Sequence, residues 1–208
     1  MSSRSRRVVL FLSLLALGAA GLAAKRLWRA EAVPSPTAAG VTRVSPPLSL
    51  PDFRLQATSG RSFARADLAG QWSLLFFGYT HCPDVCPTTL KSLQAVAAQL
   101  RARGRPVQVV FVTLDPARDT PDKLQAYLGY FDPAFIGLGG DADELSRLRE
   151  ALGVYAARTE AHSAAGYLLG HTDRLFLLNP RGEVVALIAE RDDSRRLAQT
   201  IAAMMQAG

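Results

Sequence analysis

The sequence predicts an α/β sandwich around a mixed central sheet, preceded by an N-terminal transmembrane helix. Two buried strands flank an amphipathic helix in mid-chain, two further strands and a closing helix follow, and an uncharged apolar run lies near the N-terminus. Such alternation of strands and helices indicates helices layered on a sheet. With 208 residues, 49% of them hydrophobic, the chain suits one domain with an appendage and is too apolar for a disordered protein.

The appendage is the apolar run over residues 8–24, which carries no charge and follows three arginines. It is longer than most signal-peptide cores and near the lower limit for a bilayer span. No strict Ala-x-Ala site directly follows it. We therefore expect residues 1–24 to be an uncleaved membrane anchor, residues 25–44 a linker and residues 45–208 an exported domain. A cleaved signal is the alternative, and it also exports the domain.

The basic charge of the chain is concentrated in its first 40 residues. The formal net charge is +6, but these residues hold six basic and one acidic side chain, which leaves 18 basic and 17 acidic for the rest. Because nucleic-acid binding depends on a basic surface, the nearly neutral remainder argues against that function.

The first half of the domain predicts a hairpin and a strand–helix–strand unit. Strands Leu48–Phe53 and Arg61–Phe63 flank turn-forming residues. Ser73–Tyr79 and Val107–Leu114 are short apolar runs typical of buried strands. Apolar residues recur at helical spacing between them, at Leu90, Leu93, Ala97 and Leu100. A crossover of this kind joins parallel strands.

The second half predicts two helices, a hairpin and a last helix. Thr120-Pro121 is typical of a helix start, and the acidic residues from Asp141 begin the next helix. Strands 175–178 and 184–188 are joined by an Asn-Pro-Arg-Gly turn. An amphipathic helix over 194–205 closes the chain.

The residues that point to chemistry are the two cysteines, Cys82 and Cys86, between a buried strand and a helix start. A helix N-terminus lowers thiol pKa values, and four-residue spacing places both side chains on one helix face. The pair can therefore close a disulfide or hold a soft metal such as Cu(I) or Zn(II). A purely structural disulfide is the alternative, but one closing so short a loop stabilises little.

Three histidines compete as a third ligand. His81 adjoins Cys82, and because successive side chains usually diverge, we expect it to be an exposed loop residue. His162 lies in a polar stretch and is also expected to be exposed. His171 lies in a loop before a buried strand, from which it can approach the cysteines, and the pattern alone leaves its role open.

Other polar features near the cysteines have two interpretations. Asp84 either caps the following helix or acts in the outer shell of the site or in partner docking. Asp115–Pro121 follows a strand at its carboxyl end, where sites gather in open α/β sheets, so it either shapes the site or serves only as a turn and helix cap. Met204 and Met205 lie at core-like spacing in the last helix, which predicts packing.

Several blocks of the sequence resemble the Sco/SenC family of copper chaperones. They are Phe-Phe-Gly-Tyr-Thr-His-Cys-Pro-Asp-Val-Cys-Pro at 76–87, Asp-Pro-Ala-Arg-Asp-Thr-Pro at 115–121, His162-Ser163, Tyr-Leu-Leu-Gly-His-Thr at 167–172 and Asn-Pro-Arg-Gly at 179–182. The blocks occur in order across about residues 45–190, and the expected N-terminal anchor fits the family.

The resemblance implies a thioredoxin-like fold and one copper ion bound by Cys82, Cys86 and His171. It also implies an anchor in the bacterial or the mitochondrial inner membrane and a role in maturing the dinuclear copper site of cytochrome c oxidase subunit II. Of the two membranes we expect the bacterial one, with the domain in the periplasm. The family commonly has Asp directly before the histidine ligand, where this chain has Gly170, which bears on affinity and on the preference between Cu(I) and Cu(II). In an oxidising compartment the cysteines form a disulfide, so loading needs a thiol reductant besides an upstream copper donor.

Three functions therefore compete. The first is a metallochaperone, which is not an enzyme in the strict sense. The second is a thiol–disulfide oxidoreductase that reduces the cysteines of a partner, and the third is a thiol peroxidase, which the resemblance disfavours. Copper binding requires His171 whereas disulfide exchange does not, so this side chain separates the first two functions.

Overall fold

The computed structural model describes residues 40–163, 166–189 and 191–207, with only the backbone described for 160–163 and 207. The strands are β1 Val41–Ser49, β2 Arg54–Ala57, β3 Ser62–Ala64, β4 Trp72–Gly78, β5 Val107–Thr113, β6 Ile136–Gly139, β7 Ala156–Ser163, β8 Gly166–His171, β9 Leu175–Leu178 and β10 Glu183–Ile188. The helices are the 3-10 helix η2 Arg65–Leu68 and the α-helices α2 Val85–Ala102, α3 Pro121–Gly129, α4 Ala142–Ala151 and α5 Ser194–Ala207.

The centre of the domain is an eight-stranded mixed sheet in the order β1-β10-β9-β4-β5-β6-β2-β3. β4 and β5 run parallel and are joined by α2, which confirms the predicted crossover, and β6 continues the parallel part. β9 lies antiparallel on the other side of β4, followed by β10 and β1. Among the described residues β7 and β8 pair only with each other, so they form a separate two-stranded sheet.

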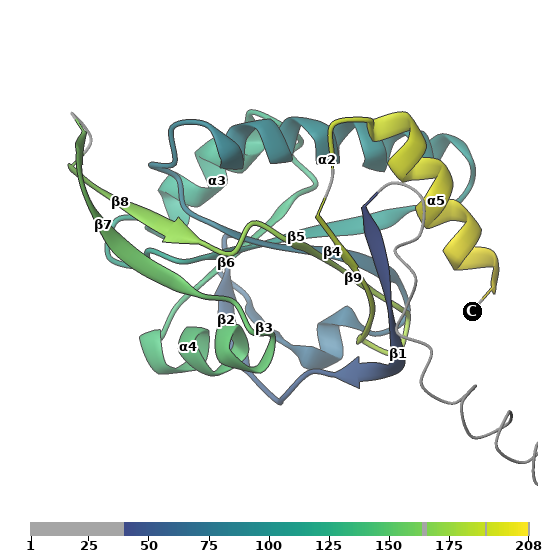
Figure 1. Ribbon diagram of the computed structural model, residues 1–208. Helices are drawn as coiled ribbons and strands as arrows, with labels where there is room; N and C mark the ends of the chain where they lie inside the picture. The colour runs from purple at the N-terminus through teal and green to yellow at the C-terminus, as the bar shows by residue number, and fades with distance from the viewer. Residues whose placement is uncertain (1–39, 164–165, 190, 208) are drawn as a thin grey trace, which may run out of the picture. The chain divides into compact units, whose positions relative to one another are not determined.

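Helices cover both faces of the sheet (Figure 1). Successive side chains of a strand point to opposite faces, and β4 shows this in its fully buried residues. Leu74 and Phe76 pack in the cluster that includes α2, α3 and α5, whereas Leu75 and Phe77 pack in the cluster that includes α4 and η2. Each fully buried Leu or Phe side chain stabilises the fold by about 1.5–3 kcal/mol, so these two layers fix the position of β4.

The predicted helix starts are confirmed. The Thr120 side chain accepts a hydrogen bond from Lys123 N at the start of α3, and Asp141 accepts from the backbone N–H groups of Asp143 and Glu144 at the start of α4. Capping side chains of this kind satisfy amides that have no partner within the helix.

The N-terminal part of the domain differs from the prediction. The strand before the β2–β3 turn is Arg54–Ala57 and not Leu48–Phe53. Leu48 instead lies in β1, opposite Val184 and one residue before the strand ends. Leu50 and Phe53 are buried in the connecting segment, so the apolar pattern marked burial there and not a strand. β1 begins at Val41, before the expected domain boundary at residue 45.

The register of β1 aligns its start with the end of β4. Val41 lies opposite Ile188, which lies opposite Leu175, which in turn lies opposite Phe76. The chain therefore enters β1 at the same end of the sheet at which β4 leads into the cysteine loop.

In the part of the chain that the structure describes, no helix combines the length and apolarity needed to cross a bilayer. The expected anchor over residues 1–24 lies outside the described residues.

Candidate metal centre

The structure brings Cys82, Cys86 and His171 together. One sulfur of each cysteine and one ring nitrogen of the histidine all lie within 4.8 Å of one another. Both cysteines are free thiols, and Cys86 Sγ lies 3.7 Å from His171 Nε2. His171 is the last residue of β8 and not a loop residue as expected. Two sulfurs and an imidazole nitrogen are a donor set that suits Cu(I) or Zn(II).

The cysteines are held where β4 leads into α2. Cys86 lies in the first turn of α2, fully buried, and its backbone N–H donates to Cys82 Sγ over 3.4 Å. Cys82 lies in the preceding loop and is half-buried. Gly78 leaves room for this packing: a Cβ there would lie 3.0 Å from Cys86 Sγ and 2.8 Å from the Phe111 ring.

The imidazole of His171 is oriented by its backbone neighbour. Nδ1 lies 3.0 Å from the Thr172 carbonyl oxygen, and since a carbonyl only accepts, Nδ1 carries the proton. In the neutral ring Nε2 then has a free lone pair toward the sulfurs, the usual arrangement of a histidine ligand. The rings of Tyr79 and Phe76 pack around it with centroids 6.0 and 6.5 Å away.

The two thiols titrate differently. A hydrogen bond from the Cys86 thiol lowers the pKa of Cys82, with further lowering by His171 and by the backbone of Cys86 and Asp84, against the opposing effect of burial. The hydrogen bond to Cys82 and burial raise the pKa of Cys86. Deprotonation of the metal-free pair is therefore expected to begin at Cys82, while Cys86 keeps its proton to higher pH.

The histidine responds to this thiolate. Burial lowers the pKa of His171, but the hydrogen bonds to Cys82 and to the Thr172 carbonyl outweigh burial, so the pKa is raised overall. A metal ion that binds all three groups has to displace the Cys86 proton and any proton on Nε2. Metal affinity is therefore expected to rise with pH.

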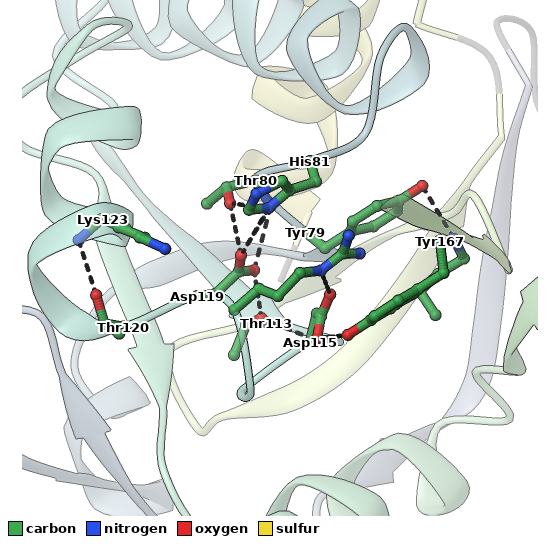
Figure 2. A network of polar contacts seen from close by, with 11 residues as sticks. Tyr79, Thr80, His81, Thr113, Asp115, Asp119, Thr120, Lys123 and Tyr167 are labelled. Carbon is green, nitrogen blue, oxygen red and sulfur yellow. Dashed lines mark hydrogen bonds and ion pairs between the residues drawn. The ribbon is translucent and has the colours of Figure 1, made fainter. Parts of the chain in front are cut away.

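A buried carboxylate fastens the cysteine loop (Figure 2). Asp119 is 3% exposed and accepts hydrogen bonds from Thr80 N at 3.1 Å, from Thr80 Oγ1 at 2.5 Å and from Thr113 Oγ1 at 2.6 Å. His81 Nδ1 lies 3.0 Å from Thr80 Oγ1 and 3.8 Å from Asp119. His81 lies in the loop as expected, but it belongs to this polar network and 29% of its side chain is exposed, so the expectation that it is exposed is wrong.

The remaining sequence candidates take other places. Asp84 occupies the N-cap position of α2, yet its side chain makes no capping hydrogen bond. Met204 is buried and Met205 packs against the same cluster, as predicted. The side chain of His162 lies outside the described ones.

Sequence reasoning missed two tyrosines near the site. Tyr79 Oη accepts a hydrogen bond from Leu169 N, and Tyr167 Oη donates to Asp115. These contacts join residues 90 and 52 positions apart, and no local pattern in the sequence pairs them. Their place in the motif blocks was the only signal.

Comparisons with known proteins agree with this geometry. The family model SCO1/SenC matches residues 43–206. The mitochondrial SCO2 homolog of Bos taurus is 39% identical over 133 residues, which cover 63% of this chain and 50% of that protein. The chain thus spans about half the length of such mitochondrial relatives.

Solved structures match the same domain. The crystal structure of Arabidopsis thaliana ScoI with copper bound has a TM-score of 0.73 and 30% identity, covering 76% of this chain and 99% of that one. Yeast Sco1 with copper bound has a TM-score of 0.72 and 30% identity, covering 78% and 91%. The expected thioredoxin-like α/β fold with a mixed central sheet is thereby confirmed.

Proposed function

Because the chain belongs to the SCO1/SenC family, we propose that it is a copper chaperone that binds one Cu(I) ion through Cys82, Cys86 and His171. The observation that carries the proposal is the meeting of these three donor atoms within 4.8 Å. Two relatives of known structure are named with copper bound, which supports copper over zinc as the ion. We also propose that the same three ligands bind copper in the Cu(II) oxidation state.

The donor set favours a transferable ion. Soft thiolates prefer Cu(I), and one imidazole completes a three-coordinate site. Two thiolates, Cu(I) and a neutral histidine carry a net charge of about −1, which the N-terminus of α2 stabilises. Cys82 is half-buried whereas Cys86 is fully buried, so an incoming thiolate would approach from the Cys82 side and bind before Cys82 leaves.

The proposal extends to the protein that receives the copper and to the compartment in which the domain works. Family membership supports the dinuclear copper site of cytochrome c oxidase subunit II as the acceptor. We propose residues 1–24 as an inner-membrane anchor, residues 25–44 as the linker and a periplasmic domain as the working part. An upstream donor supplies copper, and a dithiol reductant converts a Cys82–Cys86 disulfide to two thiols while its own thiols become a disulfide.

The inequality of the two thiols favours a second function, thiol–disulfide exchange. Cys82 is accessible and has a lowered pKa, as an attacking thiolate needs, whereas Cys86 is buried and protonated. The Cys82 thiolate would attack one sulfur of a partner disulfide, which breaks that S–S bond, forms a mixed disulfide and releases the other partner sulfur as a thiolate that takes a proton from solvent. Cys86 would then attack Cys82 and pass its proton to the departing partner thiolate, which leaves this chain oxidised and the partner reduced.

Copper titration of the reduced chain separates the two functions. Wild type is expected to bind one Cu(I), and His171→Ala to bind it much more weakly. Tyr155→Phe, a control at a side chain that is 68% exposed, is expected to bind like wild type. Full one-to-one binding by His171→Ala at unchanged affinity would overturn the three-ligand site. Weak copper binding by His171→Ala together with unchanged reduction of a disulfide substrate would show that both functions exist and are separable.

A further inference from the structure

The strand that carries His171 lies outside the main sheet. In the part of the chain that the structure describes, β8 forms ladder hydrogen bonds only with β7. The cysteines, in contrast, follow β4, which is paired on both sides. Residues 172–174 join His171 to β9 in the main sheet. The distance between the imidazole and the sulfurs therefore depends on this short link and on contacts between the β7–β8 hairpin and the rest of the domain.

Three alternate residues of β8 provide those contacts. Tyr167, Leu169 and His171 share one face of the strand because side chains alternate with a period of two. The Leu169 side chain packs against the main core cluster, and its backbone N–H donates to Tyr79 Oη over 3.1 Å. Tyr167 Oη donates to Asp115 Oδ1 over 2.7 Å. The strand is thus held at its far end by Tyr167 and in its middle by Leu169.

The acceptor of the Tyr167 hydrogen bond is itself fixed. Asp115 is 4% exposed, and Arg118 Nε donates to its other oxygen. The Arg118 guanidinium also lies over the Tyr167 ring, 3.6 Å from its centroid. Asp115 and Arg118 therefore hold both the hydroxyl and the ring of Tyr167 (Figure 2 shows the two partners Asp115 and Tyr167).

One short turn connects both halves of the metal centre. Asp115 and Asp119 are joined by a hydrogen bond from Asp119 N to the Asp115 carbonyl oxygen, 2.9 Å long. Asp119 fastens the cysteine loop through Thr80, and Asp115 fastens the histidine strand through Tyr167.

We propose that Asp115, Arg118 and Tyr167 are positioning residues that hold the His171 imidazole at the sulfurs, with the turn 115–119 as the common support. The expected effect of these residues on Cu(I) affinity rests on the proposed copper site. The expected effect of these residues on the position of the imidazole does not depend on copper. Loss of the Tyr167 hydroxyl leaves all three metal ligands in place but releases the far end of β8.

The test uses Tyr167→Phe, with Tyr155→Phe as the matched control because Tyr155 is 68% exposed and precedes the same hairpin. Cu(I) affinity is measured by chelator competition in reduced protein. Tyr167→Phe is expected to lower affinity about tenfold, the size of one lost hydrogen bond to a charged group, while Tyr155→Phe leaves it unchanged. An unchanged affinity in Tyr167→Phe would overturn the proposal.

A double-mutant cycle separates positioning from a general structural role. In the His171→Ala background the Tyr167→Phe substitution is expected to have no further effect, because there is no imidazole left to position. An equal loss with and without His171 would contradict the proposal. Asp115→Asn, which keeps an oxygen acceptor for Tyr167, is expected to lose less affinity than Asp115→Ala.

The second measurement needs no copper. The ring resonances of His171 in reduced, metal-free protein are expected to shift in Tyr167→Phe and to stay in place in Tyr155→Phe, as recorded by NMR. Unshifted resonances in Tyr167→Phe would overturn positioning even where copper binding is normal. Conversely, failure of the wild type to bind Cu(I) would overturn the proposed function and leave the NMR result to decide the positioning role.

Discussion

The cysteine ligands and the histidine ligand meet at the metal centre, but different parts of the fold hold them in place. Cys86 is fully buried at the start of α2, behind a strand with hydrogen-bonded neighbours on both sides. His171 ends a two-stranded hairpin outside the main sheet. The hairpin is held by the short link of residues 172–174 to β9 and by the hydrogen bonds Tyr167–Asp115 and Leu169–Tyr79. The difference teaches that the sulfurs form the fixed half of the centre, whereas the imidazole is the half whose position can be altered by changes elsewhere.

Ligand removal gives the largest expected effect and tests this asymmetry. Cys82→Ala is expected to lower Cu(I) affinity by more than about a hundredfold, beyond the usual range of changes in the outer shell of a metal site, because a soft thiolate is lost. His171→Ala is expected to cost less, since two thiolates remain. Chelator competition on the reduced variants measures both. Equal losses would remove the distinction between a fixed and an adjustable half.

Added methyl groups test the packing of the two regions. Gly78→Ala places a Cβ 2.8 Å from the Phe111 ring and 3.0 Å from Cys86 Sγ, whereas Gly170→Ala meets only Thr159 Cγ2 at 3.3 Å. We expect Gly78→Ala to lower the free energy of unfolding by about 1–3 kcal/mol. Gly170 is partly exposed and its neighbour Thr159 is exposed, so Gly170→Ala should change it by less than about 0.5 kcal/mol. Denaturant titration of the metal-free chains compares them, and a similar loss in both would contradict the stated difference in packing.

Thiol reactivity sharpens the comparison within the cysteine region. Because the pKa of Cys82 is lowered and that of Cys86 is raised, Cys82 is expected to be alkylated at pH 6, where an ordinary thiol is less than about 1% ionised. Cys86 should stay unmodified there. In Cys86→Ala the hydrogen bond that lowers the pKa of Cys82 is gone, so the alkylation profile should move to higher pH. Mass spectrometry across pH measures this; two thiols reacting in parallel near pH 8.5 would refute it.

The smallest expected effect concerns the residue before the histidine. Gly170→Asp adds a carboxylate next to His171 and favours Cu(II) over Cu(I) by charge. We expect the reduction potential of bound copper to fall by less than about 59 mV, the one-electron equivalent of a tenfold change. Gly170→Asn is the neutral control of the same shape. A similar shift with Asn would assign the effect to geometry instead of charge.

The sequence predicted the cysteine region better than the histidine region. The apolar runs of β4 and β5 and the helical spacing of Leu90, Leu93 and Ala97 are local signals, and they placed Cys82 and Cys86 correctly at a strand–helix junction. β7 and β8 have no such signal because much of their length is polar and partly exposed. β6 was missed for a different reason: with four residues, two of them glycine, it is too short to show a strand pattern.

The ligand set shows the same limit. His171 and Cys86 lie 85 positions apart, and the residues alone did not join them; the family resemblance did. Tyr167 and Asp115 were paired by neither. Side-chain contacts across the fold depend on how the hairpin packs, which no short-range pattern encodes.

The register of β1 bears on how far the metal centre can lie from a membrane that holds the N-terminus. Val41 lies level with Phe76 across β10 and β9, so the polypeptide that precedes the domain is fastened beside the thiol end. If residues 1–24 hold the protein to a bilayer, the roughly 16 residues up to Val41 form a leash of at most about 55 Å when fully stretched. A connection of this length would limit the distance between the domain and the membrane. Copper exchange would then be restricted to acceptors whose binding sites lie near the membrane surface.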